Sequence, residues 1–326
     1  FSKGVFYVSI ARYSGILISI IIGSILARLL TPEEFGIVAI VTVFIVFFNL
    51  LSELGIGPAV IQNKQLSEKN VQAIFTFSLI IGLLLATTFF LFAPSIATFY
   101  NEPELKSICR WLSVIVLVQS MRVVPNALLQ KNHQFKFLSI ITVTIQLSSG
   151  IIAILLAYWG FSYYALVIRS IVASVSSFII FFVFAPIRMK VYLDFESLKK
   201  IYAFSSFQFM FNFINYFTRN ADKLLIGKFL STASLGYYEK AYTLMLLPVG
   251  SLTDVITPVL FPILSNYQHD KKYVFDIFCK TVRVLAFIGF PLSVFLYYSS
   301  SELIYFVFGK QWTDSIPVFR ILSLTV

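Results

Sequence analysis

The residues of this chain that could do chemistry are charged and amide side chains placed inside long hydrophobic segments. In the segment 205–229 they follow the spacing i, i+3, i+7, i+10 and i+11, which puts them along one face of a helix. A charge at the centre of a membrane-spanning helix costs about 2.5–3.5 kcal/mol on insertion scales, so we expect this face to meet protein or a wet cavity instead of lipid. The residues are Asn212, Asn215, Arg219, Asp222 and Lys223.

Comparable polar faces are predicted in two further hydrophobic segments. The segment 111–130 carries three amides and one guanidinium at i, i+3, i+7 and i+11, beside a kink expected at Pro125. The segment 236–262 carries two carboxylates, a hydroxyl and a glycine on one face, interrupted by Pro248. These residues are Gln119, Arg122, Asn126 and Gln130 in the first segment, and Glu239, Thr243, Gly250 and Asp254 in the second.

The charges inside the hydrophobic segments have a cationic excess, with five cations against four carboxylates. Guanidinium forks and lysine point charges both bind phosphate oxygens, so the surplus suits a substrate that carries phosphate. The carboxylates are candidates for coupling transport to an ion gradient. The cations are Arg12, Arg122, Arg169, Arg219 and Lys223, and the carboxylates are Glu53, Asp222, Glu239 and Asp254.

Each assignment has a plainer structural alternative. Arg219 and Asp222 could form an i, i+3 pair within one helix. Arg12 and Arg122 could snorkel to the interface or cap a neighbouring helix. Glu53 could pair with an arginine of another span or carry a proton. Snorkelling is the favoured interpretation for three cations toward the ends of their segments, namely Lys280, Arg283 and Arg320.

Catalytic and metal-binding motifs are missing from the sequence. His133 and His269 stand in predicted loops beside lysines, and no zinc-protease, phosphate-loop, nucleophile-elbow or paired-carboxylate pattern occurs. Cys109 and Cys279 lie far apart without a CxxC partner, so neither a disulfide framework nor a zinc site is predicted. We therefore expect a protein that is not an enzyme and that uses no metal and no cofactor.

The composition requires a membrane around these side chains. Of the 326 residues, 58% are hydrophobic and 12% are charged, with a mean hydropathy of +0.87, whereas soluble proteins have roughly 25% charged residues. The formal net charge of +10 is scattered between apolar runs, without the dense basic and aromatic surface that nucleic acid needs. A soluble fold and nucleic-acid binding are thereby excluded.

Nine hydrophobic segments have the length of about 20 residues that a transmembrane helix needs. The connections are short, and 190–200 is predicted to be an amphipathic helix at the interface. Counting Lys and Arg by side gives eleven against five, which predicts a cytoplasmic N-terminus. The spans are predicted at 5–29, 36–60, 74–98, 111–130, 137–158, 161–185, 205–229, 236–262 and 275–298, with a tenth that begins near 315.

An internal repeat appears when the chain is shifted by 200 residues, which sets ARLLTPEEFG (27–36) over GKFLSTASLG (227–236). Both copies join two hydrophobic helices through a hydroxyl cap. Six spans separate the copies, and because this number is even, the repeat is parallel and predicts two six-helix lobes. The predicted domains are an N-terminal lobe (1–187, spans 1–6), an amphipathic cytoplasmic linker (188–204) and a C-terminal lobe (205–326, spans 7–10).

Three segments carry a resemblance to a known family: ARLLTPEEFGIVAI (27–40), ELGIGPAVIQ (53–62) and RNADKLLIGKFLSTASLGYYEKAYTLMLLPVG (219–250). They resemble the polysaccharide exporters of the multidrug/oligosaccharidyl-lipid/polysaccharide (MOP) superfamily, above all its Wzx-like flippases of lipid-linked oligosaccharides. The resemblance implies an all-α, MATE-like polytopic membrane protein of twelve to fourteen spans, with two lobes around a central cationic cavity. The second lobe of this chain stops at about span 10, so we expect the chain to be a piece of a longer protein.

The resemblance implies a flippase that moves polyprenyl-pyrophosphate-linked oligosaccharide across the bacterial inner membrane by alternating access, for O-antigen, capsule or exopolysaccharide. Its expected partners are that substrate, membrane lipids and a polysaccharide polymerase with other assembly proteins. The residues expected to contact pyrophosphate or glycan are Arg12, Arg122, Arg169, Arg219, Lys223, Asn212, Asn215 and Asn126.

Other functions remain open at this point. A multidrug or cation antiporter of the same superfamily would favour a cavity of carboxylates and aromatic rings over one with surplus Arg and Lys. A lipid II flippase is a close alternative. A membrane-embedded glycosyl- or acyltransferase would need a catalytic histidine or paired carboxylates at a membrane face, which the histidines and short loops argue against. Since no nucleotide-binding motif occurs, an ion gradient or consumption of the glycan outside must drive transport.

Overall fold

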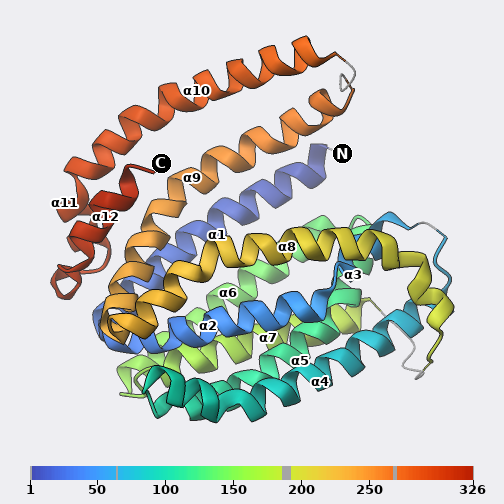
Figure 1. The fold of residues 1–326 in the computed structure, drawn as a ribbon, viewed down its shortest axis with the longest axis horizontal. Helices are drawn as coiled ribbons and strands as arrows, with labels where there is room; N and C mark the ends of the chain where they lie inside the picture. Colours follow the sequence, from blue (N-terminus) through green and yellow to red (C-terminus); the bar gives the residue numbers. More distant parts are fainter. Residues whose placement is uncertain (1, 64, 186–191, 267–269, 326) are drawn as a thin grey trace. The chain divides into compact units, whose positions relative to one another are not determined.

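The computed structural model describes residues 2–63, 65–185, 192–266 and 270–325, and their side chains except in 2–7, 195–208 and 251–266. The regular structure in these ranges is entirely helical (Figure 1). The helices are α1 (Ser2–Leu29), α2 (Pro32–Glu53), α3 (Ile56–Gln62), α4 (Glu68–Tyr100), α5 (Glu104–Lys131), α6 (Phe135–Tyr158), α7 (Tyr164–Phe184), α8 (Phe195–Phe229), α9 (Thr232–Asn266), α10 (Lys271–Tyr298), α11 (Ser300–Val307), the short 3₁₀ helix η1 (Lys310–Trp312) and α12 (Ser315–Ser323).

Eight of the nine predicted spans coincide with one helix each, and the protein is a multi-pass membrane protein. Among the residues with described side chains, seven helical segments are long and apolar enough to cross a bilayer. They are Val8–Leu29, Pro32–Gln62, Glu68–Tyr100, Glu104–Lys131, Phe135–Tyr158, Tyr164–Phe184 and Lys271–Tyr298. The predicted spans 205–229 and 236–262 lie within α8 and α9, and the tenth begins where α12 begins.

The predicted continuous span 36–60 is wrong in one respect, because it is two helices instead of one. Leu54 (φ 41°) and Gly55 (φ 70°) both adopt the left-handed conformation and separate α2 from α3. The N–H of Leu54 still bonds to the carbonyl of Leu50, so α2 ends in a left-handed cap. The break falls directly after Glu53, one of the charges expected inside the membrane.

The predicted interfacial helix over 190–200 stays a prediction. Residues 190–191 lie outside the described part, and residues from Phe195 onward belong to α8, which runs without interruption to Phe229. Figure 1 shows the first turns of α8 bending away from the rest of the helix. The predicted division into lobes at 187 and 205 stays a prediction, while the chain separates into two compact units, Phe1–Leu235 and Gly236–Val326.

The two copies of the repeat form helical hairpins with the same spacing. The first hairpin ends α1 at Leu29 and begins α2 at Pro32, and the second ends α8 at Phe229 and begins α9 at Thr232, so both boundaries shift by 200 residues. Thr31 forms the predicted capping box, since its Oγ1 accepts from the N–H of Glu34 at 3.3 Å and its own N–H donates to the Glu34 carboxylate at 2.6 Å. Ser231 Oγ accepts from the N–H of Ser234 at 3.0 Å, the equivalent cap.

The helices of the first unit pack through small residues, as helices do where no water drives them together. The largest contacts join α4 to α5 and α1 to α6. A Cβ atom added to Gly82 of α4 would lie 2.5 Å from Ser120 Cβ of α5, and one added to Gly150 of α6 would lie 2.0 Å from Ile22 Cδ1 of α1. A larger residue at position 82 would therefore clash with the Cβ atom of Ser120, and one at position 150 would require the Ile22 side chain to move.

We expect Gly82→Ala to lower the melting temperature of the full-length protein in detergent. Alanine gains about 1 kcal/mol over glycine inside a helix, but overpacking against the fixed Ser120 Cβ costs about 1–3 kcal/mol. Gly23→Ala is the matched control, because a Cβ there meets nothing within 4 Å. The double variant Gly82→Ala/Ser120→Gly should recover the loss, and an unchanged melting temperature in Gly82→Ala alone would contradict the close contact.

Candidate functional site

A polar cavity of about 350 Å³ lies among α2, α3 and α5 in the first unit. Seven of the twelve residues that line it carry an amide, a hydroxyl or a charge, although all three helices belong to membrane-spanning segments. The lining consists of Asn49, Ser52 and Glu53 from α2, Gly57, Pro58 and Ile61 from α3, and Gln119, Arg122, Val123, Asn126, Ala127 and Gln130 from α5.

The cavity exists because α3 does not continue along the axis of α2 but leaves it at an angle. The left-handed pair Leu54–Gly55 turns the chain at one end of α3. At its other end, Lys131 Nζ donates to the main-chain carbonyl of Asn63 at 2.7 Å and ties α3 to the end of α5. Beneath it, Ile56, Val60 and neighbouring apolar side chains of α4 and α5 form a buried cluster, which fixes the floor of the site.

Arg122 and Glu53 are the two charged residues of the lining. Arg122 is half-buried and Glu53 is exposed to the cavity, and their opposite charges attract each other. The structure records no hydrogen bond from the Arg122 guanidinium to any residue that it describes. Arg122 lines a cavity of about 350 Å³, and its planar guanidinium, with five N–H donors, matches phosphate or carboxylate oxygens in pairs.

Amide groups supply the rest of the polarity. Asn49 Oδ1 is buried and has no hydrogen-bond partner among the described residues. A buried acceptor of this kind normally holds water or a ligand group. Together with Asn126 and Gln130, it offers both donors and acceptors, which hydroxyl-rich ligands require. Gln119 is partly engaged, since its Nε2 donates to Ser174 Oγ of α7 at 3.4 Å.

All four residues of the polar face predicted for 111–130 line this cavity, and their role stays a prediction. Asn49 and Ser52 share the cavity with Glu53 and are not among the residues predicted from the sequence. Their signal was present, because the three residues stand at i, i+3 and i+4 inside a hydrophobic segment and so share one helical face.

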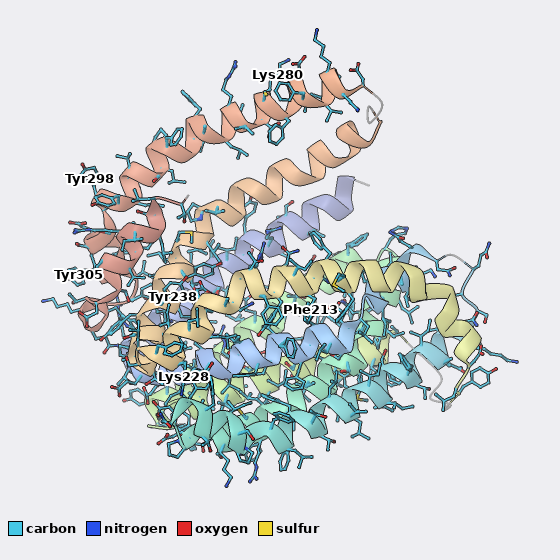
Figure 2. All side chains as sticks on the ribbon, viewed as in Figure 1. Phe213, Lys228, Tyr238, Lys280, Tyr298 and Tyr305 are labelled. Atoms are coloured by element: carbon cyan, nitrogen blue, oxygen red, sulfur yellow. The ribbon has the colours of Figure 1, made fainter. Side chains whose placement is uncertain are left out.

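The polar face predicted for 205–229 lies elsewhere in the first unit. On α8, Phe213, Tyr216 and Phe217 surround Phe47 of α2, with ring centroids 5.3–6.4 Å apart, and Figure 2 shows Phe213 between the two helices. The polar residues flank this aromatic contact. Arg219 is exposed, and the others, Asn212, Asn215, Asp222 and Lys223, are half-buried.

The remaining predicted residues are distributed over both units. In the first unit, Arg12 of α1 is exposed and Arg169 of α7 is half-buried. In the second unit, Glu239 is half-buried beside Lys240, whose Nζ lies 5.2 Å and 5.5 Å from the ring centroids of Phe308 and Trp312. The side chain of Asp254 lies outside the described residues.

The structure thus brings Glu53, Arg122 and Asn126 together in one cavity. Its lining contains one cation and one carboxylate, so the other predicted cations do not add a positive excess to this cavity. Within the described ranges, no three His, Cys, Asp or Glu side chains are grouped as metal ligands would be.

A family model described as "Polysaccharide biosynthesis protein" matches residues 25–317. The chain belongs to this family. It is 28% identical over 327 residues to the teichuronic acid biosynthesis protein TuaB of Bacillus subtilis, with 99% of this chain covered and 67% of that protein. The chain therefore spans about two thirds of the length of this relative.

Two solved structures share the fold. The lipid II flippase MurJ in an inward closed conformation superposes with a TM-score of 0.77 at 16% identity, over 98% of this chain and 72% of that one. An inward-facing multidrug resistance MATE family transporter of the MOP superfamily gives a TM-score of 0.69 at 15% identity, over 95% and 78%. The predicted all-α, MATE-like fold is confirmed.

The cavity is expected to be open to water from the side of the membrane that holds the N-terminus, because it lies at the ends of α2 and α5 on that side. In full-length protein with Cys279→Ser, a cysteine at Asn126 should react with a membrane-impermeant maleimide about tenfold faster in inside-out vesicles than in right-side-out vesicles. Val116→Cys is the control, since Val116 is fully buried. Faster labelling of position 126 from the opposite side would contradict this orientation.

Proposed function

We propose that the full-length protein is a flippase that moves polyprenyl-pyrophosphate-linked oligosaccharide from the cytoplasmic to the periplasmic leaflet of the bacterial inner membrane. The observation that carries the proposal is the polar cavity among α2, α3 and α5, inside membrane-spanning helices. Membership of a polysaccharide biosynthesis family supports a glycan as the cargo. A fold shared with a lipid II flippase supports the movement of a lipid-linked molecule.

The chemistry of the cavity fits the head group of such a substrate. The pyrophosphate is anionic and is suited to the guanidinium of Arg122, while sugar hydroxyls are suited to the amides of Asn49, Asn126 and Gln130. The polyprenyl tail remains in the surrounding lipid while the head group crosses. The cavity of about 350 Å³ therefore needs to hold only the part of the substrate next to the pyrophosphate.

The predicted orientation places this cavity at the cytoplasmic side, where the substrate is loaded. Arg219, exposed on α8, extends the path toward the opposite leaflet, because it stands ten residues before the end of that helix at Phe229, and an exposed cation within a span is expected to face a wet cavity. Arg12, exposed on α1, stands at about the depth of Asn49 and belongs to the loading side of the path. Asn212, Asn215, Lys223 and Arg169 complete the proposed path. Alternating access then opens the path first to the cytoplasmic side and next to the periplasmic side, and the head group crosses between them.

Genetic complementation tests the proposal. The full-length protein is expressed in bacteria that lack their own polysaccharide flippase, and surface glycan is compared with accumulated polyprenyl-linked intermediate. We expect wild type to restore surface glycan and Arg122→Gln to reduce it about 10- to 100-fold, since loss of a charge-assisted contact costs about 1.5–3 kcal/mol. Arg219→Ala should also lose export.

Arg283→Gln is the matched control, because it removes an exposed guanidinium from α10, outside the proposed path, and should leave export intact. All variants are compared at equal amounts of membrane-inserted protein. Normal export by Arg122→Gln would overturn the assigned cavity. Persistence of the glycan intermediate, together with rescue of bacteria depleted of their own lipid II flippase, would favour the lipid II flippase, the second candidate from the shared fold.

We propose further that a carboxylate couples transport to an ion gradient. Glu53 is the best placed of the predicted candidates, because it shares the cavity with Arg122 and its charge attracts that guanidinium. Protonation or ion binding at Glu53 would release Arg122 for the pyrophosphate, whereas a bare carboxylate competes for it. Asp222, Glu239 and Asp254 are the other candidates.

In vesicles, Glu53→Gln should make flipping independent of the imposed proton or sodium gradient, because the neutral amide mimics the protonated state permanently. Flipping is followed by the access of labelled oligosaccharide to an external glycosidase. If collapsing both gradients leaves wild-type flipping unchanged, ion coupling by any of these carboxylates is excluded, while the flippase proposal stands on the complementation result.

A further inference from the structure

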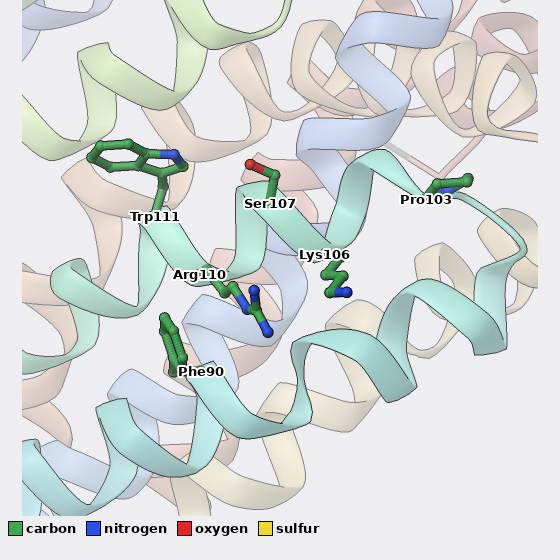
Figure 3. A pocket seen from close by; sticks show the side chains of 6 residues that line it. All are labelled: Phe90, Pro103, Lys106, Ser107, Arg110 and Trp111. Atoms are coloured by element: carbon green, nitrogen blue, oxygen red, sulfur yellow. The ribbon is translucent and has the colours of Figure 1, made fainter.

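A second cavity lies on the other side of the first unit, between α4 and the beginning of α5, and the proposed flippase path does not use it. Its volume is about 400 Å³, and it is lined by Phe90 of α4 and by five residues from Pro103 to Trp111. Figure 3 shows Lys106 and Arg110 both pointing from α5 toward α4, with Arg110 next to Phe90. These five residues are Pro103, Lys106, Ser107, Arg110 and Trp111.

The position of the cavity along α5 places it at the membrane surface. At 1.5 Å per residue, the 28 residues of α5 measure about 42 Å, which is about 12 Å more than the hydrocarbon core, so each end extends about 6 Å beyond it. Lys106 lies about 3 Å from the start of the helix and Arg110 about 9 Å from it. Lys106 therefore stands among lipid head groups, and Arg110 and Trp111 stand at the boundary with the acyl chains.

The two cations are arranged for a shared anion. Lys106 and Arg110 are four residues apart on one face of α5, where like charges repel and destabilise the helix. Within the part of the chain that the structure describes, neither side chain has a salt bridge to a carboxylate. Glu104 projects elsewhere, since two residues turn a helix by about 200°. An anion held between the two cations removes their repulsion.

The surrounding side chains favour a phosphate group joined to an apolar chain. The Arg110 Cζ atom lies 5.0 Å from the Phe90 ring centroid, a cation–π contact that leaves the guanidinium edge free for oxygen atoms. Ser107 Oγ accepts from Tyr164 Oη at 3.4 Å, so its own hydroxyl hydrogen can be donated to a further oxygen. Trp111 is 60% exposed and Phe90 is 42% exposed, which provides apolar surface directly below the cations.

We propose that this cleft binds one anionic phospholipid of the outer leaflet, with its phosphodiester between Lys106 and Arg110 and its acyl chains against Phe90 and Trp111. Aromatic residues at the interface and paired cations are the features that retain anionic lipids at protein surfaces. The lipid would fill this cleft, which lies between the end of α4 and the beginning of α5. The site does not depend on the proposed function, because it lies at the opposite end of α5 from the substrate cavity.

Quenching of Trp111 fluorescence by brominated lipid tests the proposal. Full-length protein is placed in nanodiscs that contain a minor fraction of brominated phosphatidylglycerol or brominated phosphatidylcholine. The signal of Trp111 is isolated as the difference between wild type and Trp111→Phe. We expect half-maximal quenching at about a tenfold lower fraction of brominated phosphatidylglycerol than of brominated phosphatidylcholine, because two cations attract an anionic lipid.

The double variant Lys106→Gln/Arg110→Gln should reduce the quenching to the phosphatidylcholine level. Lys280→Gln/Arg283→Gln is the matched control, because it removes one exposed lysine and one exposed arginine from α10 and should keep the preference. A preference that survives in the first variant, or that is lost equally in the second, would overturn the site. Displacement of the brominated lipid by inorganic phosphate would assign the cleft to a free phosphate and overturn the lipid as its occupant.

Discussion

The hydrocarbon core of the bilayer offers no hydrogen bonds, and most of this structure follows from that constraint. Backbone groups must be satisfied within the chain, so the described regular structure is helical throughout. Polar side chains must be satisfied by protein or by trapped water, so Asn49, Glu53, Arg122 and Asn126 share one cavity instead of being scattered over lipid-facing surfaces. Helix contacts then depend on close approach, which explains why Gly82 and Gly150 meet side chains with no space left for a Cβ.

The helix α5 carries two different chemistries at its two ends. Toward its beginning, Lys106 and Arg110 present bare cations beside exposed aromatic rings. Toward its end, the charge of Arg122 is balanced by Glu53, and the other polar residues around it are mostly neutral amides. A balanced cavity can release an anion, whereas two uncompensated cations at the interface retain one. The difference separates a place for passing cargo from a place for a resident lipid.

Much of the fold could be predicted from the sequence because the membrane imposes a simple length rule on hydrophobic segments. The hairpins at 29–32 and 229–232 were found through hydroxyl caps and the 200-residue shift, which depend only on local residues. The polar face of 111–130 was likewise found through helical spacing. The break at Leu54 was not, since leucine rarely adopts a left-handed conformation and nothing in its immediate sequence besides Gly55 signals one. The separation of Arg12, Arg169 and Arg219 from the cavity depends on how helices rotate against one another, which periodicity alone does not determine.

The short helix α3 forms one wall of the substrate cavity and is attached to the rest of the unit at both ends. At Leu54–Gly55 the chain turns through two residues, and at Asn63 the carbonyl receives the Lys131 ammonium. Between these two ends, Ile56 and Val60 are buried against α4 and α5, so the wall is held along its whole length. A wall held in this way is preorganised, and its polar neighbours keep their positions before any cargo arrives. Binding therefore costs little ordering of the chain.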